Sequence, residues 1–299
     1  MPDLSIIIVS YNTASVTKEC LTSLVHSLSD SSTLSAEIIV VDNNSHDDSL
    51  KILKTFGRSP FPKQIDFKVI ANNSNVGYAK GNNIGLRHAK GKYVLYLNSD
   101  VIIKNVDWQN LITYLKENSS VAGLTVRVLL PTGIIDPASH RGFPNPWNAF
   151  CYFSKLERLT AQIPILNRLF GGYHQTYKNL SSPHTIDSPS GAFFLVKKHI
   201  LDKLGGFDEA FFMYGEDLDL SYRIKGLGYT ITYDPRYSVT HFKYQSGLGS
   251  TSSHAKDQTR THFYDAMKIF YAKQYAPHYP SWFNRCMMWA IDQKMRTSK

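Results

Sequence analysis

Four short apolar segments, each ending in polar residues, constrain the fold of this chain more than any other feature. Runs rich in Ile and Val are typical of strands that are covered on both faces. Between the segments, residues 14–28 and 78–90 are the predicted helices. Strand followed by helix in this order predicts right-handed crossovers and an α/β fold, with a mostly parallel sheet and helices on both faces. The predicted strands are residues 4–10 (LSIIIVS), 37–41 (EIIVV), 67–71 (FKVIA) and 91–97 (GKYVLYL).

Polar side chains follow every one of these strands. Open parallel sheets bind ligands at the carboxyl ends of their strands. Asn, Asp and Ser also form turns and helix caps, which is the structural alternative. Four such clusters on one edge favour a polar cleft. The clusters are Ser10, Tyr11 and Asn12; Asp42, Asn43, Asn44 and Ser45; Asn72 and Asn73; and Asn98, Ser99 and Asp100.

The glycines do not form a recognised phosphate-binding loop. Neither G-x-x-x-x-G-K-[ST] nor a G-x-G-x-x-G opening the first helix is present. Gly77, Gly81 and Gly85 instead recur every four residues along the second predicted helix, which leaves a smooth stripe on one face. The stripe fits either close approach of a ligand or tight packing of the helix on the sheet. Lys80 and Asn83 on the same segment are candidates for reaching a diphosphate.

The second half of the chain contributes carboxylates and one histidine. Residues 188–198 predict a strand, and residues 204–229 predict a loop that leads into a helix with Glu216, Asp217 and Asp219 at its start. Acidic residues are common in a first helical turn, so this cluster has a structural explanation. Nearby aromatic residues favour instead a partly desolvated carboxylate that takes a proton from a hydroxyl group. His241 follows another predicted strand, and a lone His is more often an ordinary polar residue than a ligand.

Composition narrows the classes of partner. The chain has 299 residues, 42% of them hydrophobic, which suits one large or two small globular domains. A net charge of +9 favours nucleic acid, acidic lipid or phosphorylated substrates. We expect no nucleic-acid partner, because no recognition helix or aromatic RNA-binding motif is present. The cysteines Cys20, Cys151 and Cys286 form no CxxC motif and no zinc set.

The two ends of the chain bear on its location. No apolar run approaches the roughly 20 residues of a membrane-spanning helix, and the amino terminus lacks the pattern of a secretory signal. We therefore expect a cytoplasmic protein. Residues 280–299 mix Trp, Phe and Met with Arg and Lys. This composition fits a helix that lies on an anionic membrane surface, peripheral at the inner face of the plasma membrane, and equally a terminal helix packed on the domain.

Four motifs together resemble a known family. LSIIIVSYN, EIIVVDNNS, NVGYAKGNNIG and YLNSD, in this order and spacing, resemble the nucleotide-binding half of a family 2, GT-A fold glycosyltransferase of the bacterial rhamnosyltransferase-like branch. The resemblance implies a catalytic domain over residues 1–275, with C-terminal helices. Within it, residues 1–130 would bind the nucleotide-sugar, 131–250 the acceptor, and 251–275 would form a helix. Residues 276–299 would form the amphipathic basic helix.

The resemblance also implies roles for residues. Asp100 would bind a divalent metal, Mn²⁺ or Mg²⁺, and His241, in an H-x-x-x-x-S pattern that ends at Ser246, would complete the metal shell. Asn98 replaces the first carboxylate of the D-x-D pattern. Asp217 would be the catalytic base and Glu216 would bind the acceptor, leaving Asp219 structural. The nucleotide-binding set would be Ser10, Tyr11, Asn12, Asp42, Asn72, Gly77, Lys80, Asn83, Asn98 and Ser99.

The function implied is metal-dependent, inverting transfer of a sugar from a nucleoside diphosphate donor to a glycan or polyprenyl-linked acceptor in cell-surface polysaccharide synthesis. Rhamnose from dTDP-rhamnose is the first expectation. A UDP-sugar donor (hexose, GlcNAc or galactofuranose) and a non-catalytic nucleotide-sugar-binding module are the alternatives. Residues 243–258 fit either a lid or a plain loop, and residues 131–183 an acceptor-facing insertion in which Trp147, Tyr173 or Tyr177 stacks on a sugar.

Overall fold

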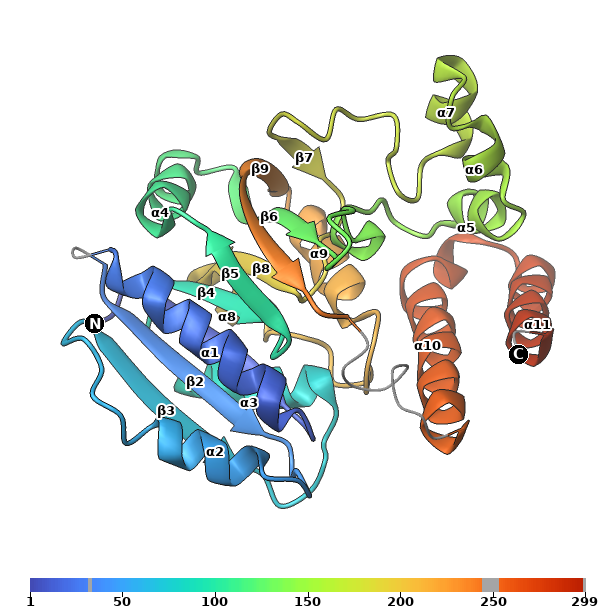
Figure 1. Ribbon diagram of the computed structural model, residues 1–299. Helices are drawn as coiled ribbons and strands as arrows, with labels where there is room; N and C mark the ends of the chain where they lie inside the picture. Colours follow the sequence, from blue (N-terminus) through green and yellow to red (C-terminus); the bar gives the residue numbers. More distant parts are fainter. Residues whose placement is uncertain (32–33, 244–252, 298–299) are drawn as a thin grey trace.

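The computed structural model describes residues 1–31, 34–243 and 253–297, which contain a nine-stranded sheet in the order β3-β2-β1-β4-β8-β6-β9-β5, with β7 paired to β9 (Figure 1). The strands are β1 Leu4–Ser10, β2 Ala36–Asp42, β3 Ile65–Ala71, β4 Tyr93–Leu97, β5 Val101–Asn105, β6 Val121–Leu129, β7 His184–Ile186, β8 Phe193–Lys197 and β9 Thr230–His241. The helices are α1 Ala14–Ser29, α2 Ser49–Phe56, α3 Tyr78–His88, α4 Trp108–Glu117, η1 Pro137–Ser139, α5 Pro146–Phe153, α6 Leu156–Thr160, α7 Pro164–Phe170, α8 Lys198–Leu204, α9 Glu216–Gly226, α10 Ser253–Gln274, η2 Ala276–His278 and α11 Ser281–Thr297.

The first half of the sheet is parallel, as the sequence predicts. β1 pairs with β2 and β4, and β2 pairs with β3, all parallel. The register places Ser10 level with Asp42, and Asp42 level with Ala71. The carboxyl ends of these strands therefore meet at one edge, and the prediction of a shared polar edge is confirmed.

The second half of the sheet is mixed: β6 and β9 are parallel, but the other pairings there are antiparallel, so the expectation of a mostly parallel sheet is met in full only by β1 to β4. β8 runs antiparallel to both β4 and β6, and β5 runs antiparallel to β9. The last of these pairings is important for the site, because it aligns Val101 with His241. The polar turn after β4 is thereby brought beside the end of β9.

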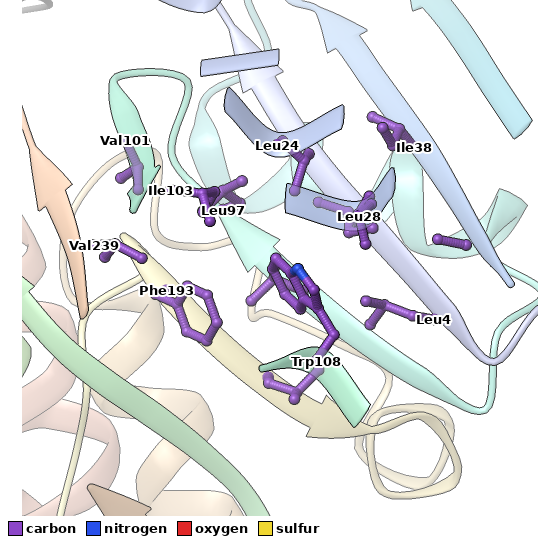
Figure 2. Packing of buried hydrophobic residues seen from close by; sticks show 14 of the residues in the cluster. Leu4, Leu24, Leu28, Ile38, Leu97, Val101, Ile103, Trp108, Phe193 and Val239 are labelled. Atoms are coloured by element: carbon purple, nitrogen blue, oxygen red, sulfur yellow. The ribbon is translucent and has the colours of Figure 1, made fainter. Parts of the chain in front are cut away.

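Helices cover both faces of the sheet, as predicted. One buried cluster joins the sheet to α1, α2 and α4, and a second joins it to α3, α8 and α9. Figure 2 shows the first cluster, in which Trp108 and Phe193 lie below Leu24 and Leu28 of α1. The Trp108 and Phe193 rings stack with centroids 6.0 Å apart, and the Trp108 indole donates to Ser27 Oγ at 2.9 Å.

The glycine stripe of α3 is a packing surface. A Cβ atom at Gly81 would lie 3.1 Å from Val9, and one at Gly85 would lie 2.4 Å from Ile7 Cγ2. Gly77 has φ of +86° and lies against Phe212 of a distant loop. The close approach that the spacing implies is therefore made by β1 and this loop.

Residues 142–187 form an excursion that contains α5, α6 and α7 and returns to the sheet through β7, which pairs with β9. The excursion begins and ends at one backbone pair, because Arg141 N donates to Ser188 O at 3.1 Å and Ser188 N donates to Arg141 O at 2.9 Å. Sequence periodicity indicated none of these short helices. At the carboxyl end, α11 packs on α10 through the buried Ile291 and a 2.6 Å hydrogen bond from Tyr271 to Asn284.

We expect Gly85→Ala to destabilise the protein by about 1–3 kcal/mol, because the new methyl group overlaps a buried side chain of β1. Gly226→Ala is the matched control, since nothing lies within 4 Å of its Cβ position and its backbone is helical; we expect no loss there. Urea unfolding of the two variants measures the difference, and equal effects would contradict the packing role of the stripe.

Candidate active site

The site is built around the pairing of Asp100 with His241. Asp100 lies in the turn after β4 and His241 ends β9, and both are buried. The antiparallel register of β5 and β9 brings them together, so that His241 Nε2 lies 3.2 Å from Asp100 Oδ1. A backbone hydrogen bond from Phe242 N to Asp100 O, 2.9 Å, fixes the same turn. The two predicted metal ligands, some 140 positions apart in the sequence, are thus neighbours.

A second carboxylate orients the histidine from behind. His241 Nδ1 donates to Asp136 Oδ2 at 2.9 Å, and Lys243 Nζ donates to Asp136 Oδ1 at the same distance. Burial lowers the pKa of His241, but the hydrogen bonds to Asp100 and Asp136 outweigh burial and raise that pKa to about 9. The imidazole is therefore protonated at neutral pH in the metal-free protein.

The donor set fits a divalent cation held jointly by protein and ligand. Among the described residues, no group of three or more His, Cys, Asp and Glu side chains gathers as a ligand set. Two neighbouring ligands of an octahedral ion with bonds of about 2.1 Å lie about 3.0 Å apart, close to the separation of Asp100 and His241. A carboxylate on the far nitrogen, as Asp136 supplies, is typical of metal-binding histidines. The remaining positions would fall to phosphate oxygens and water.

A series of close polar contacts connects this pair to Asp217 of α9. Asn98 Nδ2 lies 3.3 Å from His241 Nε2, and Asn98 Oδ1 accepts from the Tyr78 hydroxyl at 2.8 Å. The same hydroxyl lies 3.2 Å from Gly191 O, and Gly191 N donates to Asp217 Oδ2 at 3.2 Å. Burial raises the pKa of Tyr78, and the nearby charges of α9 add to that effect. The hydroxyl therefore stays protonated and acts as a donor.

Asp217 is buried and fully engaged on one oxygen. Its Oδ2 accepts from Arg141 Nη2 at 2.7 Å and from Gly191 N, while Oδ1 accepts, within residues 1–31, 34–243 and 253–297, only from Leu218 N at 2.7 Å. Arg141 donates also to Pro189 O, so that the guanidinium is held in place. One oxygen of Asp217 thus anchors the side chain, and the other keeps capacity to accept a further hydrogen bond.

Glu216 is a buried carboxyl group that forms no salt bridge within the described residues. It is buried at the first position of α9, and its Oε2 has no hydrogen-bond partner in the described part of the chain. Burial, reinforced by the charge of Asp217, raises the pKa of Glu216 to about 8. Glu216 is therefore largely neutral at pH 7, and its carboxyl group can donate a hydrogen bond.

The predicted nucleoside residues line the ends of β1 to β3. Asp42 is buried; its Oδ2 accepts from Ser45 N at 3.1 Å, and its Oδ1 has no partner among the described residues. Asn12 is exposed with φ of +53°, and its Oδ1 accepts from His46 N at 2.8 Å. Tyr11 beside it is partly exposed. This edge therefore presents one unsatisfied carboxylate oxygen beside side chains that ligands can reach.

Other predicted nucleotide-binding residues are engaged within the protein. Ser10 bonds Thr13 and Thr17, and Ser99 lies 3.4 Å from Thr13. Asn72 donates to Asn43, and the Gly77 carbonyl accepts from Asn43. These contacts order the sheet edge.

Lys80 and Asn83 face the loop before α9. Lys80 Nζ lies 3.9 Å from Glu209, while Asn83 accepts from Phe207 N and donates to Phe207 O and Glu209. The whole Asn83 amide is thus used to hold this loop, which gives its burial a structural reason.

Of the remaining predicted residues, Asp219 and Trp147 are described by the structure, whereas part of the predicted lid is not. Asp219 pairs with Arg223 at 2.7 Å, as expected for a structural carboxylate. Trp147 lies in α5 and donates to Leu169 O, within the excursion. Ser246 and residues 244–252 of the predicted lid lie outside the described residues. Residues 253–258 belong to α10 and not to a loop, because the helix begins at Ser253.

The sequence and the fold can now be compared with known proteins. The model of the family described as Glycosyl transferase family 2 matches residues 5–205. The chain belongs to this family.

Individual relatives are distant. Rhamnosyltransferase WbbL of Escherichia coli (strain K12) is 28% identical over 176 residues, covering 56% of this chain and 61% of that protein. The low-salt glycan biosynthesis hexosyltransferase Agl10 of Haloferax volcanii is 28% identical over 229 residues, covering 75% and 62%. The chain thus spans less than two thirds of the length of these relatives.

The structural likeness is broader. The mannosyltransferase PcManGT from Pyrobaculum calidifontis, solved in complex with GDP-Man and Mn²⁺, has a TM-score of 0.57 at 16% identity, covering 99% of this chain and 70% of that one. This likeness shows the shared GT-A fold.

Three side chains that contact the predicted site residues were not predicted from the sequence. Asp136, Arg141 and Tyr78 each hold a predicted site residue in place. Asp136 and Arg141 lie in the aperiodic segment after β6, where nothing in the pattern marks a buried charge. Tyr78 stands inside the quoted glycine motif, but its hydroxyl contacts Asn98 after β4 and Gly191 before β8, which are 20 and 113 positions away.

We expect Glu216→Gln to change how stability depends on pH. The pKa of Glu216 rises from about 4.5 to about 8 on folding. Its contribution to the free energy of unfolding is therefore fully present below pH 4.5 and is lost as the pH rises through 8. The loss amounts to at most about 1.4 kcal/mol per pH unit. Gln cannot ionise, so the melting temperature of the variant should gain on the wild type between pH 5 and 9.

Glu19→Gln, at an exposed position of α1, is the control and should show no such trend. A melting-temperature difference for Glu216→Gln that stays flat across this range would contradict the raised pKa.

Proposed function

We propose that this protein is a metal-dependent, inverting glycosyltransferase that moves a sugar from a nucleoside diphosphate donor to a hydroxyl group of a glycan or polyprenyl-linked acceptor in cell-surface polysaccharide synthesis. One observation carries the proposal: the side chains of Asn98 and Tyr78 lie between the Asp100–His241 pair and Asp217 of α9, in close polar contact with both. In this arrangement a donor site and a base would lie at one sheet edge. Family membership supports the same reading.

The donor would lie along the ends of β1, β2 and β4. The buried, unpartnered Oδ1 of Asp42 suits a hydrogen bond from the nucleoside, and the partly exposed Tyr11 suits contact with the base. The diphosphate would then lie at Asn98 and Ser99. Asp100 and His241 would hold Mn²⁺ or Mg²⁺, which when bound neutralises charge on the departing nucleoside diphosphate. Because the imidazole is protonated without metal, metal binding would release a proton.

Asp217 would act as the base through Oδ1. The acceptor hydroxyl gives its proton to this oxygen while its own oxygen forms a bond to the anomeric carbon. The bond from that carbon to the diphosphate oxygen breaks on the opposite face, and the electron pair leaves with the nucleoside diphosphate. Arg141 would keep the carboxylate oriented throughout. The neutral Glu216 carboxyl would donate a hydrogen bond to an acceptor oxygen and so orient it.

The sugar is proposed to be rhamnose, from dTDP-rhamnose. The similarity to rhamnosyltransferase WbbL supports this choice, while the similarity to the hexosyltransferase Agl10 keeps a UDP-sugar as the alternative. A thermal-shift screen with dTDP-, UDP- and GDP-sugars, each with Mn²⁺ or EDTA, separates these donors, since a bound ligand raises the melting temperature by mass action.

Asp217→Asn should lower turnover by about 10³-fold or more while leaving nucleotide binding intact, because the proton acceptor is lost. Glu216→Gln should retain turnover and mainly raise KM for the acceptor. Steady-state kinetics with the donor found in the screen, together with calorimetric binding of the nucleotide, measure both. If Glu216→Gln abolishes turnover and Asp217→Asn does not, the base is Glu216. Binding of the donor without any turnover by the wild type would instead support a non-catalytic nucleotide-sugar-binding module.

Asp100→Ala and His241→Ala should each weaken binding of the nucleoside diphosphate in Mn²⁺ by about tenfold or more, and change it little in EDTA. The reason is that both side chains would act through a shared ion. Asp219→Asn is the control, since its carboxylate pairs with Arg223 away from the pair. Equal losses in Mn²⁺ and in EDTA would remove the shared ion from the proposal.

A further inference from the structure

The excursion carries the densest group of exposed apolar side chains in the described chain. Ile165 is 82% exposed and Leu159 is 75% exposed, and both lie on short helices or their ends. Large apolar side chains exposed in one region of a surface mark interaction sites. We define the excursion surface by six exposed residues: Trp147, Phe150, Leu159, Ile163, Ile165 and Leu169.

The charge on this surface has one sign. Lys155, Arg158 and Arg168 are exposed between the apolar residues. Neither acid of the same segment adds a free negative charge: Glu157 is buried and accepts hydrogen bonds from the backbone and ring of His174, and Asp187 is half-buried and pairs with Lys225. An apolar surface interspersed with positive charge alone is the pattern of proteins that lie on anionic bilayers.

Helix α11 continues the surface. Trp282, Arg285, Trp289 and Arg296 recur at intervals of three, four and seven residues, so they share one helix face, opposite the buried Ile291 that packs on α10. Three of the four tryptophans, Trp147, Trp282 and Trp289, are thus exposed on the excursion and α11, while Trp108 is buried. Tryptophan is enriched at the membrane–water boundary. Figure 1 shows α5, α6, α7 and α11 on the same side of the molecule, away from β1 to β3.

A basic concavity lies where the excursion meets α11. It has a volume of about 560 Å³, and its lining includes Tyr152, Phe153, Lys155, Arg158 and Lys294, together with the engaged Glu157. Lys294 Nζ lies 5.5 Å from the centre of the Phe153 ring, which ties the two elements together. Three cations beside aromatic rings suit an anionic phosphate headgroup.

We propose that the excursion surface and the outer face of α11 together form a docking surface for an anionic lipid bilayer. The described helices include none that is both long enough and apolar enough to span a membrane. The geometry therefore points to a helix-rich surface that lies in the interface, with its apolar side chains among the acyl chains and its cations at the headgroups.

Charge decides against a second copy of this chain as the occupant. A twofold contact would place the surface against itself. It would then bring Lys155, Arg158 and Arg168 close to the same residues of the other copy, and like charges across an interface are costly. An anionic bilayer satisfies the apolar and the cationic parts of the surface at once.

Docking on a bilayer does not depend on the catalytic roles proposed above. The excursion starts next to Arg141, which holds Asp217, so the docking surface and the proposed base are joined by a short stretch of chain. If the proposed function holds, a polyprenyl-linked acceptor would reach the base from the bilayer on this side.

Vesicle flotation of the full-length protein tests the proposal. It compares vesicles of phosphatidylcholine alone with vesicles that contain about 25% phosphatidylglycerol, an anionic lipid. We expect binding to the anionic vesicles, weakened by high salt, and a blue shift of tryptophan fluorescence on binding. Ile165→Glu with Leu169→Glu should weaken binding by about tenfold or more, because two inserted apolar groups become charged. Lys155→Glu with Arg158→Glu should remove the preference for phosphatidylglycerol.

Ile134→Glu is the matched control, since Ile134 is 65% exposed but lies outside both elements, and it should bind as the wild type does. Unchanged melting temperatures exclude misfolding as the cause of a loss. Three results would overturn the proposal: no wild-type binding to anionic vesicles, unaltered binding by Ile165→Glu with Leu169→Glu, or a wild-type dimer by light scattering that this variant dissociates. Because no step uses turnover, the result is independent of the catalytic assay.

Discussion

The antiparallel register of β5 on β9 is the constraint on which the rest of the site depends. It aligns Val101 with His241, and so brings a turn from the first half of the chain against a strand end from the second. Asp100 and His241 then lie 3.2 Å apart without any loop having to reach across the molecule. A one-residue slip would turn His241 to the other face of the sheet. On its other side, β9 pairs with β6 from Thr230 to Thr240, and this long pairing helps to fix the register.

Buried charge is distributed in a consistent way around this register. Asp136, Asp217, Asp219 and Asp234 are buried, and each is paired with a cation that lies within hydrogen-bond distance. Asp42 and Glu216 depart from this pattern, because each is buried with one carboxylate oxygen unpartnered among the described residues. Glu216 lies near the charge of Asp217, and its pKa rises to about 8. A structural carboxylate in that position would be costly, because a buried ion without a partner forfeits its hydration. The cost is understandable if a ligand supplies the missing partner.

The sequence predicted what depends on local pattern. The four parallel strands, the helices α1 and α3 and the acidic start of α9 follow from apolar periodicity and turn residues, and they agree with the structure, whereas α2 between β2 and β3 was not predicted. The antiparallel half of the sheet was not predictable, since β8 inserts between β4 and β6 only through long-range pairing. Asp136 and Arg141 were missed for the same reason: their partners lie 105 and 76 positions away. Lys80 and Asn83 also have protein partners in the loop before α9, so their predicted contact with a diphosphate stays a prediction.

The backbone pair of Arg141 and Ser188 has a consequence for how this molecule can vary. Residues 142–187 leave the sheet at this pair and return to it through β7, which pairs with β9. The helical part before β7 can therefore change in length and sequence without altering a strand that carries the site. If the docking proposal holds, this part could adapt to a different surface while Asp100, His241 and Asp217 keep their places. Arg141 connects the two regions: its backbone pairs with Ser188 at the base of the excursion, and its guanidinium donates to Asp217.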